Sequence, residues 1–165
     1  MKGESIMERI ASFQVDHVRL NRGLYVSRID EINGNYLTSF DIRMKLPNRE
    51  PVINIAELHT MEHLGATFLR NHPVWKEQIV YFGPMGCRTG FYLILKEKLE
   101  SKDIVELMKE LYKFMAEFKG DIPGATAIEC GNYLDQNLPM ANYEAKKYLE
   151  ETLENLSEEN LNYPE

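Results

Sequence analysis

Two histidines spaced four residues apart, His59 and His63, are the side chains of this sequence that most directly suggest chemistry. They lie in a stretch with helical periodicity, where positions i and i+4 share one face of the helix about one turn apart. Two imidazoles in that arrangement can bind one metal ion. Glu62 points to much the same side, and a carboxylate beside a bound metal is a natural proton carrier. The order H-x-x-E-H therefore predicts a metal centre with an acid–base group beside it.

A catalytic metal centre usually has three protein ligands and one open position, so a third ligand is needed. The sequence offers four candidates, which are Cys130, Cys87, His17 and His72. His72 follows His63 by about two and a half helical turns, which places it far away on roughly the opposite side. Cys130 is expected at the end of a strand, directly before a glycine, where side chains project into sites. A set of two histidines and one cysteine would suit zinc or ferrous iron.

The other thiol, Cys87, lies in a turn flanked by glycines, Gly86-Cys87-Arg88-Thr89-Gly90. Arg88 is its direct neighbour, and positive charge near a thiol favours the thiolate form. A cysteine in that environment can act as a base or a nucleophile. Two cysteines cannot form a disulfide framework, so each thiol needs its own explanation.

The elements that must position these residues follow from the spacing of apolar side chains. Helical spacing predicts helices at residues 55–71, from 101 to about 118, and from about 142 to 156. Alternating or continuous apolar runs predict strands at residues 12–16, 24–31, 36–46, 78–82, 91–95 and 125–129. Asn33-Gly34 is typical of a hairpin turn between the second and third of these strands. This order indicates a single α+β domain over residues 1–165, with a mostly antiparallel sheet and helices packed on it.

The composition is that of a folded globular domain, with 44% hydrophobic and 27% charged residues among 165. The formal charge of −7 disfavours a nucleic-acid partner. Seven glutamates and only two lysines lie in residues 144–165, so the acidity is mostly a property of the tail. We expect residues 1–10 and 157–165 to be frayed ends. No apolar run is long enough for a signal peptide or a membrane span, so we expect a cytoplasmic protein with no membrane contact.

Several motifs, taken together, resemble the S-ribosylhomocysteine lyase (LuxS) family. The similarity covers roughly residues 11–150, and its motifs agree with the family in order and spacing. They are His59-Thr60-Met61-Glu62-His63-Leu64, the run from Gly83 to Tyr92, Phe40-Asp41-Ile42-Arg43, Pro47-Asn48, Ser12-Phe13 with Asp16-His17, and Cys130-Gly131.

The resemblance implies cleavage of S-ribosyl-L-homocysteine to L-homocysteine and 4,5-dihydroxy-2,3-pentanedione. The second product is the precursor of autoinducer-2, a quorum-sensing signal, and the same step serves methionine recycling. It also implies a homodimer with active sites at the subunit interface. Each subunit would hold one divalent metal ion, natively ferrous iron, often replaced by zinc or cobalt.

The resemblance also assigns roles to residues. It implies that His59, His63 and Cys130 hold the metal and that Glu62 and Cys87 form the acid–base pair. The residues implied in substrate binding are Ser12, His17, Arg43 and Arg70. The chain departs from the family just before Pro84, where residues 80–83 lack the usual acidic residue that helps to hold the homocysteine end. The stretch after Cys130-Gly131 also lacks a histidine that is common nearby.

Two other interpretations of the same residues remain. The order H-x-x-E-H also marks inverzincin peptidases, although these are larger chains that use a carboxylate as the third ligand. The chain could instead be a non-catalytic binding module stabilised by a metal. In that case Cys87 would be a fourth ligand, because structural sites are closed by four protein ligands.

Overall fold

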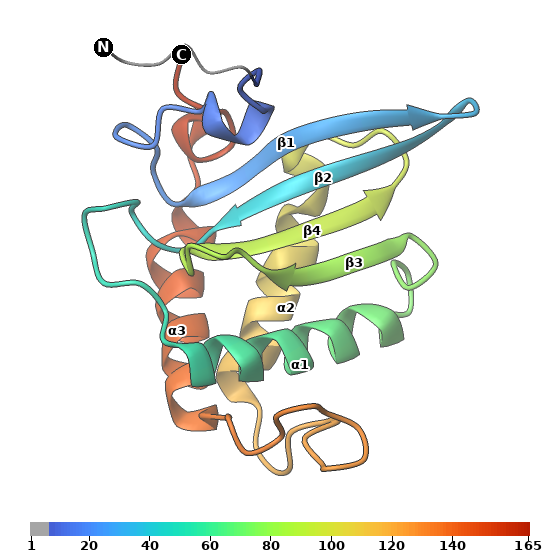
Figure 1. Ribbon diagram of the computed structural model, residues 1–165, viewed down its shortest axis with the longest axis vertical. Coiled ribbons are helices and arrows are strands. Elements are labelled where there is room, and N and C mark those ends of the chain that lie inside the picture. Colours follow the sequence, from blue (N-terminus) through green and yellow to red (C-terminus); the bar gives the residue numbers. More distant parts are fainter. Residues whose placement is uncertain (1–6) are drawn as a thin grey trace.

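The computed structural model describes residues 7–165, and its strands form one antiparallel sheet in the order β1-β2-β4-β3 (Figure 1). The strands of this described part are β1 Gly23–Ile32, β2 Asn35–Arg43, β3 Ile79–Pro84 and β4 Gly90–Lys96. Each pair of neighbours runs antiparallel. The α+β class and the antiparallel sheet are therefore confirmed.

The turn between β1 and β2 is the hairpin expected from its sequence. Asn33 and Gly34 both have positive φ, 53° and 81°, and Ile32 pairs with Asn35. Two successive residues with positive φ give a turn whose twist matches the strands, and asparagine and glycine accept that geometry readily. The hairpin fixes the register of β1 with β2, in which Gly23 pairs with Arg43. On its other side Arg43, the last residue of β2, pairs with Gly90 at the start of β4.

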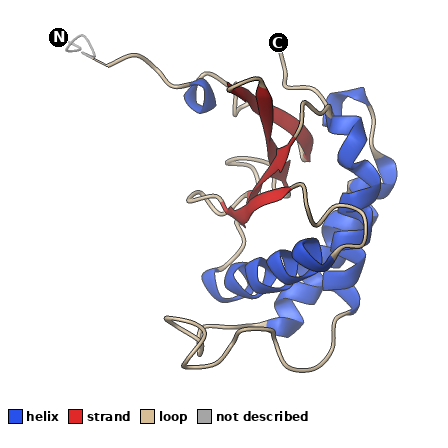
Figure 2. Cartoon of the chain, turned by 90° about the vertical axis from the view of Figure 1, so that its right-hand side faces the viewer, coloured by secondary structure: helices blue, strands red, loops and turns tan. Residues whose placement is uncertain are grey.

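Three helices pack against the sheet. α2 (Val105–Glu117) and α3 (Leu138–Glu151) cover one face, and α1 (Ile55–Asn71) runs beside β3 (Figures 1 and 2). The core lies between these layers, and it is built from the apolar stripes of the helices and the inward positions of the strands. α1 approaches β3 closely at Gly65, where a Cβ atom would lie 2.2 Å from the Phe82 ring. None of the helices described is long and apolar enough to cross a membrane.

The bounds of the helices follow local signals. α1 has the predicted bounds, since the Glu57 carboxylate accepts a hydrogen bond from the Asn54 backbone N–H (3.2 Å) and Pro73 follows the last turn. α3 begins four residues before the predicted start. The Asn137 side chain caps it by accepting from Met140 N (3.1 Å), and a proline lies in its first turn.

Two predicted strands are wrong. Residues 11–13 form a single-turn 3-10 helix, and Asp16 then accepts hydrogen bonds from the backbone N–H groups of Val18 and Arg19. Residues 125–129 form turns in the loop between α2 and α3, where Cys130 N donates to Thr126 O (3.0 Å) and Thr126 Oγ1 donates to Glu129 (2.6 Å). In both places short polar side chains bond to nearby groups and compete with strand pairing.

The C-terminal segment, residues 157–165, is also not the frayed end that we expected. It contains a 3-10 turn, Glu158–Asn160, and Asn160 Nδ2 donates to Arg22 O (2.9 Å). Gly23 permits this contact, since a Cβ atom there would lie 2.1 Å from Asn160 O. Tyr163 stacks on Tyr25 with ring centroids 4.8 Å apart. At the other end, residues 7–10 are exposed, and residues 1–6 of the expected frayed start lie outside the described residues.

Candidate active site

The structure brings His59, His63 and Cys130 together at one point. The two Nε2 atoms lie 3.0 Å apart, and Cys130 Sγ lies 3.5 Å from His59 Nε2. All three donor atoms lie within 4.8 Å of one another. Both histidines come from one face of α1, as the i, i+4 spacing predicts. Cys130 comes from the loop between α2 and α3, after a turn and not at the end of a strand.

The tautomers of the two histidines suit a metal ion. His59 Nδ1 lies 2.9 Å from the carbonyl oxygen of Asp135, and His63 Nδ1 lies 2.7 Å from that of Pro123. A carbonyl oxygen can only accept, so each Nδ1 carries the proton and each Nε2 has a lone pair. Two such lone pairs 3.0 Å apart repel each other unless a cation lies between them. The donor set therefore fits a divalent metal ion.

The loop that carries Cys130 is fastened to α1 on both sides of the cluster. Gly124 has a positive φ of 70°, and a Cβ atom there would lie 3.2 Å from His63 Nδ1. Further along, Thr60 Oγ1 donates to Gln136 Oε1 (2.7 Å) and accepts from Asn137 N (2.9 Å). The position of the cysteine therefore depends on hydrogen bonds between the loop and the helix.

The remaining candidates for the third ligand lie elsewhere. Cys87 is not part of the group of donor atoms, and the Nδ1 atom of His17 lies 2.8 Å from the carbonyl oxygen of Val15. His72 ends α1, where its Nδ1 accepts from the N–H groups of Val74 and Trp75, both at 3.1 Å. Its Nε2 then donates to the Glu110 carboxylate (2.8 Å), so this histidine closes the helix and binds α2.

Cys87 is exposed in the turn between β3 and β4. Its Sγ lies 3.1 Å from Thr89 Oγ1 and 4.0 Å from Arg43 Nη1, and Arg43 Nη1 donates to Thr89 Oγ1 (2.7 Å). The guanidinium of Arg88, the neighbour of Cys87 in the chain, donates to Ile53 O (3.4 Å), whereas the guanidinium that contacts the thiol is that of Arg43. The cation beside the thiol comes from β2, across the sheet.

Arg43 is held by a buried ion pair with Asp41. Its Nε donates to Asp41 Oδ1 (3.0 Å) and its Nη2 to Asp41 Oδ2 (2.6 Å), and both side chains are almost completely buried. Burial alone would lower the pKa of Arg43, but the charge of Asp41 and its hydrogen bonds raise that pKa above its ordinary value. The guanidinium therefore stays charged beside Cys87.

The other predicted site residues lie in different places. Glu62 is half-buried on α1, directly before His63. Ser12 lines a hollow on the sheet face away from the helices, together with Tyr81 and Tyr92. Arg70 is exposed near the end of α1 and donates to Val80 O (3.2 Å), beside the uncharged stretch before Pro84.

Three residues that hold the site are not among the predicted site residues, and only one of them gives a signal in the sequence. Asp41 is an acidic residue within an apolar strand, which is a signal of a buried partner. Thr89 and Gly124 give no signal, because their roles depend on contacts with residues far away in the chain. The first contacts Arg43 and the second contacts His63.

The cluster has three protein donors, whereas structural metal sites are usually closed by four. Three donors, with a carboxylate on the same helix, are the set expected of a catalytic site that keeps one position for a substrate. The fold and the cluster thus define an α+β metal-dependent enzyme.

Comparison with known proteins gives the particular family. A model of the S-ribosylhomocysteinase (LuxS) family matches residues 10–159. The S-ribosylhomocysteine lyases of Clostridium acetobutylicum and Clostridium beijerinckii are both 63% identical to this chain, covering 96% of it and 100% and 99% of their own lengths. That of Phocaeicola vulgatus is 58% identical, over 96% of this chain and 98% of its own length. The chain belongs to the S-ribosylhomocysteinase family.

Proposed function

We propose that this protein is a carbon–sulfur lyase that cleaves S-ribosyl-L-homocysteine to L-homocysteine and 4,5-dihydroxy-2,3-pentanedione. The observation that carries the proposal is the cluster of His59, His63 and Cys130 with a free position, in a chain that belongs to this family. The second product would be the precursor of autoinducer-2. The enzyme would act in the cytoplasm, in methionine recycling and in quorum sensing.

The reaction needs two proton shifts and one elimination. The aldehyde of the ribose becomes a 2-ketone and then a 3-ketone, each time through an enediolate. A carbonyl at C3 makes the C4 proton acidic. Loss of that proton expels the thiolate of homocysteine from C5 and leaves an enol with a double bond between C4 and C5. The enol then takes up a proton at C5 and gives up its hydroxyl proton, which yields the methyl ketone of the product. The enzyme must therefore stabilise negative oxygen atoms and move protons between neighbouring carbons.

His59, His63 and Cys130 would hold one divalent metal ion in each subunit. We propose ferrous iron as the native ion, with zinc or cobalt as replacements, because two imidazoles and a thiolate suit all three. When bound, the ion would supply a Lewis acid for the negative charge that develops on the sugar oxygens. The hydrogen bonds from the two Nδ1 atoms to the loop carbonyls would orient the imidazoles for this task.

Cys87 and Glu62 would carry the protons. A thiolate at Cys87 would take and return the protons on carbon, and Arg43 would favour that thiolate at 4.0 Å. Glu62, directly before the ligand His63 on α1, would serve the sugar oxygens. The two roles call for different positions, and the two side chains come from different elements, the β3–β4 turn and the helix.

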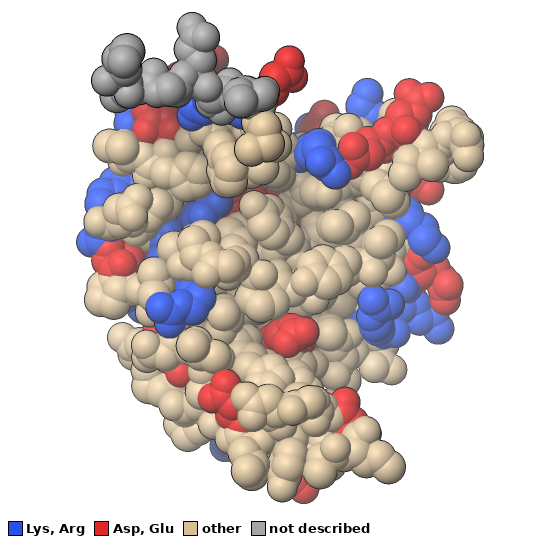
Figure 3. All heavy atoms as spheres, in the orientation of Figure 1, with Lys and Arg blue, Asp and Glu red and all other residues tan. Residues whose placement is uncertain are grey.

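We propose that the active form is a homodimer with its sites at the subunit interface. The sheet face without helices is covered mainly by uncharged side chains, and the charged ones lie mostly at its margins (Figure 3). Ser12 and His17 precede β1, and Ser12 lines the hollow on this same face. They would complete the substrate site of a second subunit. Arg70 would also contact the substrate. Residues 80–83 carry no carboxylate, so the ammonium group must be held by other residues.

Neither alternative interpretation is favoured. The third donor is a thiol and not the carboxylate of an inverzincin peptidase. Cys87 does not join the donor group, so the described residues do not form the closed four-ligand site of a binding module.

The test is release of thiol from S-ribosylhomocysteine by the anaerobically purified, iron-loaded protein. We expect one free homocysteine thiol for each substrate consumed, and no hydrolysis of a peptide panel. The same protein treated with a chelator is the control and should lose the activity. Peptide hydrolysis, or no thiol above background, would contradict the proposal.

A further inference from the structure

A line of contacts connects the C-terminal segment, residues 157–165, to the exposed cysteine. Tyr163 OH donates to Asp41 Oδ2 (2.8 Å), although the two residues are 122 positions apart. Asp41 holds Arg43 through two hydrogen bonds. Arg43 in turn lies 4.0 Å from Cys87 Sγ. No step of this line passes through a residue of the metal cluster.

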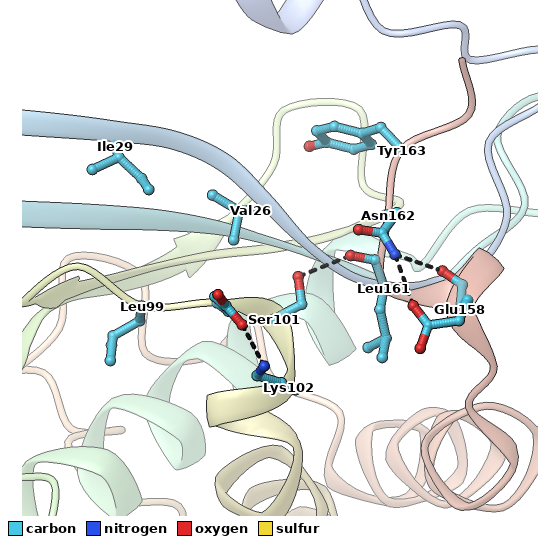
Figure 4. Close-up of a pocket in the computed structure, with 10 residues that line it drawn as sticks. Val26, Ile29, Leu99, Ser101, Lys102, Glu158, Leu161, Asn162 and Tyr163 are labelled. Carbon is cyan, nitrogen blue, oxygen red and sulfur yellow. Dashed lines mark hydrogen bonds and ion pairs between the residues drawn. The ribbon is translucent and has the colours of Figure 1, made fainter.

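Tyr163 is held firmly where it meets Asp41. Its ring stacks on Tyr25 at an interplanar angle of 14°, and Tyr25 OH contacts the carbonyl oxygen of Glu159 (3.2 Å) in the same segment. Ser101 Oγ donates to Leu161 O (3.0 Å), which fastens the segment to the 3-10 turn Ser101–Ile104 directly before α2 (Figure 4). The phenol is therefore held in place by the stacking of its ring and by the hydrogen bonds of its own segment at Glu159 and Leu161.

The phenol of Tyr163 acts as a permanent hydrogen-bond donor. Burial, the negative charge of Asp41 and the hydrogen bond to Asp41 all raise the pKa of Tyr163 above its ordinary value, so the group stays neutral. A neutral phenol that donates to one carboxylate oxygen takes up part of the carboxylate charge and fixes its plane. The remaining negative charge of Asp41 then offsets less of the positive charge of the Arg43 guanidinium. That guanidinium lies beside the thiol of Cys87.

We propose that Tyr163 is a positioning residue for Cys87, acting through Asp41 and Arg43. It does not touch the thiol, and its effect is to keep the guanidinium charge in place beside the sulfur. The inference rests on the proposed function only in assuming that Cys87 takes part in turnover. Its effect on the reactivity of the thiol can be measured without any substrate.

The test is the variant Tyr163→Phe, which keeps the ring and removes the hydroxyl. In the metal-loaded protein we expect the rate of alkylation of Cys87 by iodoacetamide to fall about fivefold, the effect of losing one typical hydrogen bond. The rate is followed by mass spectrometry of the Cys87 peptide, so that Cys130 does not contribute. With S-ribosylhomocysteine, kcat should fall by about the same factor while KM stays within about twofold.

The matched control is Tyr25→Phe. It also removes a phenol that holds the C-terminal segment, but Tyr25 OH bonds to the carbonyls of Asn21 and Glu159 and not to Asp41. We expect the alkylation rate and kcat of this variant to stay close to those of the unmodified protein.

Two outcomes would overturn the proposal. One is an unchanged alkylation rate in Tyr163→Phe. The other is an equal loss in both variants, because that would mean the segment acts only as an anchor. If the unmodified protein releases no thiol from the substrate, the proposed function fails, while the alkylation rates still decide the role of Tyr163.

Discussion

The two thiols of this protein lie in surroundings of opposite character. Cys130 is half-buried, and its sulfur meets the lone pairs of two imidazoles. Cys87 is exposed, and its sulfur meets a threonine hydroxyl and a guanidinium. Lone pairs that converge on a thiolate attract a cation, whereas a fixed cation beside a thiol favours a free thiolate. In the proposed function, the neighbours and not the residue type separate the metal ligand from the proton carrier.

The two regions are also supported in different ways. The metal cluster depends on one helix and on a loop whose carbonyls hold both Nδ1 atoms. The surroundings of Cys87 depend on the register of β2 with β4 and on the buried pair of Arg43 and Asp41. Changes in the first region should alter metal binding, and changes in the second should alter turnover with the metal retained.

The largest effect is expected from Cys130→Ala. The loss of one of three ligands should remove most of the bound metal, and activity should fall about a thousandfold or more because the Lewis acid is worth several kcal/mol. Metal content by atomic emission and thiol release by a colorimetric assay measure the two effects. A variant that keeps both would show that Cys130 is not a ligand.

A smaller loss, without loss of metal, is expected from Cys87→Ala. General acid–base groups contribute roughly a hundredfold to ten-thousandfold, so kcat should fall at least about a hundredfold. Metal content measured on the same sample should equal that of the unmodified protein. Near-normal turnover with the metal in place would exclude Cys87 as a proton carrier.

An intermediate effect on the metal cluster is expected from Gly124→Ala. The left-handed backbone there should cost about 1–2 kcal/mol in the free energy of unfolding, and the new methyl group would press on His63. We expect metal affinity to fall by about tenfold, as for the loss of a contact that orients a ligand.

Gly120→Ala is the matched control for that variant. Gly120 also has a positive φ, 106°, but nothing described lies within 4 Å of a Cβ atom built there. Denaturant unfolding should show a similar loss in both variants, and metal titration should show a loss in Gly124→Ala alone. Equal metal affinity in the two would mean that the contact with His63 has no effect on the ligand.

The smallest effect is expected from Thr89→Val. It removes the hydroxyl that accepts from Arg43 and lies against Cys87, so kcat should fall by about threefold to tenfold, the range of a single hydrogen bond. Thr38→Val is the control, because it removes a buried hydroxyl on β2 that bonds to Glu97 O, at the far end of the strand. Steady-state kinetics should show the loss of kcat in Thr89→Val alone. An equal kcat in both variants would show that the Thr89 hydroxyl does not support Cys87.

The parts of the fold that the sequence predicts are those determined by near neighbours. The bounds of α1 follow from its apolar period and its end signals, and the hairpin at Asn33-Gly34 follows from two residues that accept positive φ. The apolar pattern of residues 125–129 predicts a strand wrongly, because it does not reveal the hydrogen bond between Thr126 and Glu129. Residues 157–165 fold back through contacts with Arg22 and Tyr25, which no local pattern reveals.

The candidate site, too, is predicted from the sequence only where residues close together in the chain determine it. His59 and His63 are predicted as a pair because one helical turn separates them. The residues alone left the third ligand open among four candidates, since the loop that brings Cys130 to α1 is fixed by bonds between distant positions. The line from Tyr163 to Asp41 and Arg43 depends on strand register and on the course of the C-terminus, so it appears only in the structure.

The division of roles between the two thiols is tested most directly by the visible absorption spectrum of the cobalt-substituted protein, compared with that of its Cys87→Ala and Cys130→Ala variants. We expect a thiolate-to-cobalt band in the unmodified protein that persists unchanged in Cys87→Ala and is lost in Cys130→Ala. A band that shifts or weakens in Cys87→Ala would make Cys87 a metal ligand and would contradict the account.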